Sequence, residues 1–119
     1  MKLAPIYLIG LCVLLAGCSP KPPTPAQITA ALNASVQKEN PEASVSINGG
    51  GMGTGGKYMN VRFACSKCMR RAPGGEGKIP ADGNGSTVIG LDAGKWHYDF
   101  VQVDYEDGER SILDEKHTF

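Results

Sequence analysis

Residues 96–105 read WHYDFVQVDY, and this run decides the fold that we expect. Large apolar or aromatic side chains alternate with polar ones along it, which is the pattern of a β-strand with buried faces. A period of two divides the large side chains between two opposite faces, one with Val101, Val103 and Tyr105 and the other with Trp96, Tyr98 and Phe100. We therefore expect one long strand over 96–105.

Shorter strands are expected on both sides of this run. Glu106-Asp107-Gly108-Glu109 predicts a tight turn, because Asp-Gly tolerates positive φ, and a last strand should follow over 110–114. Upstream, alternation predicts a strand at Val45 and Ile47, one from Tyr58 through Phe63 to Cys65, and one over 87–91. Three glycine-rich stretches, 49–56, 73–77 and 83–85, are expected as loops. Since no helix intervenes between these strands, the pattern favours an antiparallel meander.

One helix is predicted before the strands. Thr24 can cap it, Pro25 suits the first helical position, and Gln27 completes a capping box. Asn40-Pro41 stops the helix near residue 39. Helical spacing places four apolar residues on one face of the helix: Ile28, Ala31, Leu32 and Val36. The expected fold class is α+β, with one N-terminal amphipathic helix packed on an antiparallel β-meander of four to five strands.

The first 18 residues carry a second pattern. A positive start at Met1-Lys2 precedes the apolar run LAPIYLIGLCVL over 3–14, which is too short to span a bilayer, since a spanning helix needs about 20 apolar residues. The next four residues are Leu15-Ala16-Gly17-Cys18. In this position they resemble the lipobox of bacterial lipoproteins. The resemblance covers the leader alone, and no family is identified for the rest of the chain.

This resemblance implies that Cys18 is the first residue of the mature protein and carries fatty acyl chains such as palmitate. The expected organisation is a signal peptide over 1–17, a lipidated Cys with a Pro-rich tether over 18–25, and a small α+β domain over 26–119. Four prolines in residues 19–25 favour an extended, stiff spacer. The expected location is the bacterial envelope facing the periplasm. Ser19, in place of Asp, favours the outer membrane over the inner.

The charges are balanced, with 12 basic and 12 acidic residues, which argues against generic nucleic-acid binding. Basic residues nevertheless gather in 57–78 and acidic ones in 92–119. The two groups can pair across the sheet. Alternatively, Lys67, Arg70 and Arg71 form a basic patch aimed at an anionic partner.

Cys65-Ser66-Lys67-Cys68 is the one chemical motif in the expected domain. Outside the cytoplasm a structural disulfide is expected between Cys65 and Cys68. Two alternatives use the same residues. In thiol–disulfide chemistry the nearby basic side chains would stabilise a Cys65 thiolate, and in copper handling Met69 would add a soft ligand. A zinc ribbon needs a second ligand pair and a c-type haem site needs His at the position of Met69, so neither is expected.

A glycine-rich stretch, Gly51 to Lys57, matches part of a phosphate loop but is not expected to bind nucleotide. Tyr58 stands where Ser or Thr must hold magnesium, and a strand follows where a helix should begin. We assign no catalytic residue, cofactor or metal. The expected function is a membrane-anchored, non-catalytic binding or accessory subunit. Its expected partners are membrane lipid, through Cys18, and another envelope protein.

Overall fold

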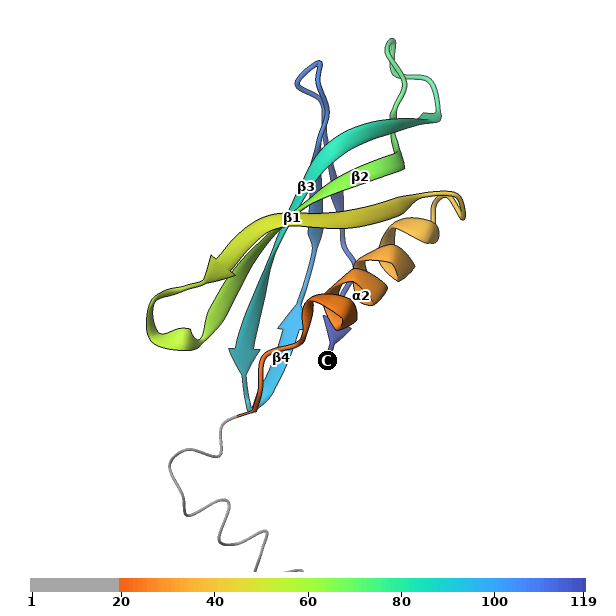
Figure 1. Ribbon diagram of the computed structural model, residues 1–119. Coiled ribbons are helices and arrows are strands. Elements are labelled where there is room, and N and C mark those ends of the chain that lie inside the picture. The colour runs from red at the N-terminus through yellow and green to blue at the C-terminus, as the bar shows by residue number, and fades with distance from the viewer. Residues whose placement is uncertain (1–19) are drawn as a thin grey trace, which may run out of the picture.

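The computed structural model describes residues 20–119, so the lipobox and Cys18 lie outside the described residues. In this range one α-helix, α2 (Pro25–Gln37), precedes seven strands of one antiparallel sheet (Figure 1). The strands are β1 (Ser44–Met52), β2 (Tyr58–Arg71), β3 (Lys78–Asp92), β4 (Lys95–Tyr98), β5 (Val101–Asp104), β6 (Arg110–Leu113) and β7 (His117–Thr118). None of residues 20–119 belongs to a helix with the length and apolar character that a membrane span requires.

Helix α2 begins as its sequence predicts. Thr24 Oγ1 accepts from the Gln27 backbone N–H, and the Gln27 side chain accepts from the Thr24 N–H, so that the capping box is complete. The helix ends at Gln37, two residues before the predicted end. Its buried face consists of Ile28, Ala31, Leu32, Ser35 and Val36.

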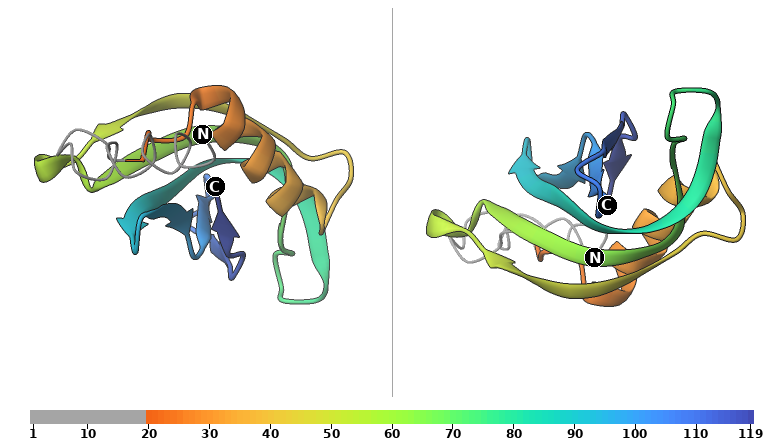
Figure 2. Two further views of the ribbon diagram at one scale, coloured as in Figure 1. Left: turned by 90° about the horizontal axis from the view of Figure 1, so that it is seen from below. Right: turned by 90° about the horizontal axis from the view of Figure 1, so that it is seen from above.

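The strands follow the order β1-β2-β3-β4-β7, while β5 pairs with β3 beside β4, and β6 pairs with β5. Figure 2 shows that β1, β2 and β3 form one strongly curved layer. The helix forms hydrogen bonds with both β1 and β4. Asn33 Oδ1 accepts from the Val45 N–H of β1 at 2.8 Å, and Ser35 Oγ lies 2.7 Å from the hydroxyl of Tyr98 in β4.

Tyr98 is the largest fully buried side chain of the core. Its hydroxyl also donates to the Ala31 carbonyl at 3.2 Å, so its polar end is satisfied inside the apolar layer. Burial raises the pKa of Tyr98. The helix is therefore attached to the sheet by hydrogen bonds as well as by apolar contacts.

The single strand expected over 96–105 is wrong, because β4 ends at Tyr98 and β5 begins at Val101. His97 lies opposite Gly90 of β3, but Gln102 lies opposite Ser86, which shifts the register by one residue. An extra residue in one strand reverses the alternation beyond it. The expected two faces are therefore merged into one buried set: Trp96, Tyr98, Val101, Val103 and Tyr105. Phe100, at the break, is 42% exposed.

The expected fold class, a helix on a meander of four to five strands, is also wrong. The described residues form mostly antiparallel sheet, with seven strands and one 13-residue helix. One reason is that the irregular segment 99–100 divides one predicted strand into two, and that β7, which was not predicted, follows β6. The other is that β1 and β3 include glycine-rich stretches that we expected as loops, 49–52 and 83–85.

The glycines in β3 make room for side chains of neighbouring strands. A Cβ at Gly85 would overlap the ring of Phe63, its partner in β2. A Cβ at Gly83 would lie 2.7 Å from Val103 Cγ1, closer than such atoms approach. These residues therefore have a packing function inside a strand, where composition alone predicts a flexible loop.

Candidate functional site

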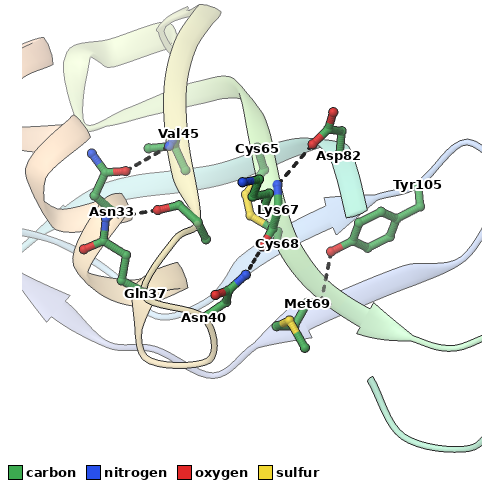
Figure 3. The surroundings of a disulfide bond; sticks show 11 residues. Asn33, Gln37, Asn40, Val45, Cys65, Lys67, Cys68, Met69, Asp82 and Tyr105 are labelled. Atoms are coloured by element: carbon green, nitrogen blue, oxygen red, sulfur yellow. Dashed lines mark hydrogen bonds between the residues drawn. A yellow bond between two sulfur atoms is a disulfide. The ribbon is translucent and has the colours of Figure 1, made fainter. Parts of the chain in front are cut away.

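The Cys65-Ser66-Lys67-Cys68 motif lies within β2, where Cys65 and Cys68 form a disulfide (Figure 3). Cys65 lies opposite Gly83 of β3 and Cys68 opposite Ala81, so that two residues of β2 face Asp82 alone. In a regular strand, residues three apart point to opposite faces. This bulge adds one residue and places both cysteines on the buried face, where they can bond.

Contacts on two sides hold the bulge. Lys67 has a φ of 57°, in the left-handed region that non-glycine residues seldom adopt. Its N–H donates to Asp82 Oδ1 at 3.1 Å, and its carbonyl accepts from Asn40 Nδ2 at 2.9 Å, as Figure 3 shows. The disulfide, β3 and the segment after α2 therefore all fix this one turn.

Both cysteines are deeply buried, with Cys65 2% and Cys68 3% exposed. Thiol–disulfide exchange requires an external thiolate to reach a sulfur atom, so burial hinders it. The same burial hinders copper handling, because it separates the sulfur atoms from solvent. In residues 20–119 no three His, Cys, Asp or Glu side chains gather at a distance suited to a metal ion. The geometry fits a structural cross-link better than a reactive pair.

The three basic residues proposed as a patch each face an acid. Arg71 Nε lies 3.2 Å from Glu109 Oε1, and Lys67 Nζ lies 3.8 Å from Glu42 Oε2. Arg70 makes the closest pair, with Nη1 donating to Asp107 Oδ2 at 2.7 Å. Two of these acids come from the acidic C-terminal part, so the pairing across the sheet is the arrangement that the structure shows.

Arg70 is the most buried cation of the three, with its side chain 10% exposed. Its Nε donates to the Arg71 carbonyl at 2.8 Å, and its guanidinium lies 5.4 Å from the centroid of the Tyr105 ring. The Tyr105 hydroxyl donates to the Met69 carbonyl at 3.0 Å. The Arg70 guanidinium holds the pKa of the Asp107 carboxyl below its usual value. Arg70 thus joins the end of β2 to the turn between β5 and β6.

The sheet face turned away from α2, here called the open face, contains two hollows. The first encloses about 600 Å³ and is lined mainly by small and polar side chains from β1, β2 and β3: Ser44, Ser46, Ala64, Ser66, Asp82 and Asn84. Asp104 lies at its margin and accepts from Arg110 Nε at 2.7 Å, which lowers the pKa of Asp104. The charged residues that line this hollow are all acidic: Asp82, Asp104 and Glu106.

The second hollow, of about 540 Å³, has a different lining. Val88 and Phe100 line it together with Arg62 and Gln102. Val88 is 47% exposed, and Ile112, which lies opposite Gln102 on β6, is 59% exposed. The sequence pattern did not single out these residues as functional. The available signal for Val88 was an apolar residue at an outward position of a strand, between the buried Thr87 and Ile89, whereas Phe100 could not be placed without the register shift.

The structure therefore separates the residues predicted as sites. Cys18 lies outside the described residues, Cys65 and Cys68 are bonded inside the core, and the cations beside them are engaged by acids. The exposed apolar residues lie elsewhere, on the open face. Comparisons with protein-family models, with curated proteins and with solved structures find no match for this chain.

Proposed function

We propose that the chain is a bacterial envelope lipoprotein that faces the periplasm. Acyl groups on Cys18 would hold it on a membrane, with the outer membrane favoured by Ser19, and its domain would act as a non-catalytic binding or accessory subunit. The lipobox-like sequence Leu15-Ala16-Gly17-Cys18 supports the anchor. Two or more acyl chains hold a protein stably on a bilayer without a spanning helix.

The observation that carries the binding role is the apolar part of the open face. Val88, Phe100 and Ile112 are each more than 40% exposed. The strand register places them together. Val88 and Phe100 each lie two residues from the Ser86–Gln102 pair, on the same side of it. Ile112 of β6 pairs with the same Gln102. Contiguous exposed apolar residues typically mark a surface that binds another protein.

Arg62 adds specificity to this surface. It lines the same hollow as Val88 and Phe100, and among the described residues no carboxylate forms an ion pair with it. A partner that presents an apolar side chain beside a carboxylate would satisfy both features. The second envelope protein is therefore expected to bind across β2, β3 and β5.

Photo-crosslinking in intact cells tests this proposal. A photoreactive amino acid replaces Val88 or Ile112 in the full chain, and the matched control replaces Ile79, which is 40% exposed but outside both hollows. The two open-face positions should give one shared adduct, and Ile79 should give none. Equal adducts from all three positions, or none from Val88 and Ile112, would contradict the proposal.

A further inference from the structure

The described part of the predicted tether lies against the domain. The carbonyl of Pro20 accepts from Trp96 Nε1 at 3.2 Å, Pro23 is buried, and Thr24 caps α2. In Figure 1 the described part of the chain begins beside β4. Residues 20–24 thus lie against the domain and do not stand free as a spacer.

This contact limits how far the domain can lie from a lipid anchor. The argument rests on the proposed function, in which Cys18 carries the acyl chains. Two extended residues span at most about 7 Å, so Pro20 lies within that distance of the Cys18 backbone. An acylated residue sits at the membrane surface. The end of the sheet that binds Pro20 must therefore lie close to the lipid headgroups.

Hydrogen bonds and strand pairing define this end of the sheet, here called the anchor end. The Leu91 N–H of β3 donates to the Lys57 carbonyl at 2.8 Å, and Leu91 pairs with Trp96 of β4. Trp96 in turn binds Pro20. One row of contacts therefore connects the start of β2, the end of β3, β4 and the tether. The charged residues on or next to this row are Lys21, Lys57, Asp92 and Lys95.

The anchor end is basic, with three lysines against Asp92. Within residues 20–119 none of Lys21, Lys57 and Lys95 forms an ion pair. By contrast, Lys38, Lys67 and Lys78 pair with Glu115, Glu42 and Glu39. Three lysines beside the anchor are thus left for an external anion, and Lys116, just before β7, is the one other lysine in 20–119 without an ion pair.

Tyr58 adds a second feature to the anchor end. It follows Lys57 and is 40% exposed. Its ring packs over Gly53, where a Cβ would overlap it. Tyrosine is enriched where proteins meet headgroups, because its ring is apolar and its hydroxyl is polar. Lysines beside an exposed tyrosine therefore match the chemistry of a phospholipid surface.

We infer that the anchor end rests directly on an anionic phospholipid surface, with Lys21, Lys57 and Lys95 at the headgroups. The domain then stands on the membrane with the turn between β5 and β6 pointing away from it. The open face is left exposed along the side of the molecule. Lysines near an anionic surface are attracted within a Debye length, so the orientation depends on lipid charge and on salt.

Trp96 provides the test, since it is the one tryptophan of the chain and lies at the anchor end. The protein is extracted from membranes, its acyl mass is measured, and it is reconstituted into vesicles of phosphatidylcholine with or without phosphatidylglycerol. A nitroxide on a lipid headgroup quenches only fluorophores near the surface. We expect Trp96 to be quenched more strongly in the vesicles with phosphatidylglycerol.

Two triple variants complete the design. Lys21→Gln with Lys57→Gln and Lys95→Gln should reduce the quenching by about twofold or more. The matched control, Lys38→Gln with Lys67→Gln and Lys78→Gln, removes the same charge elsewhere and should be quenched as the wild type. Acylated protein that floats with the vesicles while Trp96 stays unquenched, or equal quenching of both variants, overturns this inference alone. Protein without acyl mass overturns the proposed function as well.

Discussion

The two ends of the sheet use their cations differently. At the anchor end, Lys21, Lys57 and Lys95 have no ion-pair partner within the described residues. At the opposite end, where β2 meets the turn between β5 and β6, Arg70 and Arg71 are paired with Asp107 and Glu109. Of the basic residues that gather in 57–78, Lys57 thus lies at an end available for binding, whereas Arg70 and Arg71 lie at a structural end.

The difference shows that the partner of a cation decides its function more than its place in the sequence does. Arg70 is almost buried, and its guanidinium is used by Asp107, the Arg71 carbonyl and the Tyr105 ring. It has little capacity left for a ligand. The lysines of the anchor end retain all their donors for water or for an external anion.

The largest expected effect comes from removing the proposed lipid anchor at Cys18, on which the proposed role of the anchor end depends. Cys18→Ala should abolish acylation and release the protein from the membrane, because three surface lysines alone do not replace buried acyl chains. Mass spectrometry and membrane fractionation measure both changes. Wild-type protein that carries no acyl mass would contradict the anchor.

At the paired end, Arg70→Met should lower the free energy of unfolding by about 1–3 kcal/mol, because buried hydrogen bonds of a charged group are lost. The matched control is Arg62→Met on the open face, which should change it by less than about 0.5 kcal/mol. Urea denaturation followed by Trp96 fluorescence measures both. Equal effects of the two substitutions would remove the distinction between a structural and a free arginine.

The disulfide lies at the structural end and should act as a local clamp. Replacing Cys65 and Cys68 together by Ala should cost about 2 kcal/mol, since the closed loop has only four residues. Because both cysteines are buried, reductant should open the bond slowly in native protein and rapidly in urea. Iodoacetamide labelling against time measures this. Fast labelling of native protein, with mixed disulfides trapped by Cys68→Ser, would instead favour the redox alternative.

The smallest expected effect is the pH dependence of the Arg70–Asp107 pair. The pKa of Asp107 is lowered from 3.8 in the folded state, chiefly by the hydrogen bond from Arg70. A lowered pKa gives stability that is fully present well above pH 3.8 and is lost as pH falls through the folded value. Wild type should therefore exceed Asp107→Asn in melting temperature at pH 6, and the gap should narrow towards pH 3. A constant gap would contradict the assignment.

Local features of the fold were predictable from the sequence, but features that depend on register were not. The cap at Thr24 and Gln27 follows from residues three apart. The alternation of side chains does not show that one residue is inserted at Asp99 or Phe100. The faces predicted for the strand over 96–105 were therefore wrong from Val101 onward. The glycines beneath Phe63 and Val103 were interpreted as a loop from composition, because their packing function depends on partners in neighbouring strands.

The candidate sites divide in the same way. Cys65 and Cys68 were the two cysteines left outside the leader, so their pairing could be expected, but their burial depends on the bulge. The basic residues could be named, although their acidic partners lie up to 38 positions away. The contact between Trp96 and Pro20 joins residues 76 apart, and no local pattern indicates it.

The hydrogen bond from the Val45 N–H to Asn33 Oδ1 blocks part of the edge of the sheet. β1 is an edge strand, and an edge offers unpaired N–H and C=O groups to a strand of another molecule. Asn33 occupies one of these groups, and beyond Ile47 the edge changes register and continues as Gly49-Gly50-Gly51. Such an edge is a poor template for adding strands. Under the proposed lipid anchor, copies of the protein can therefore reach a high density on a membrane while β1 resists pairing with β1 of another copy.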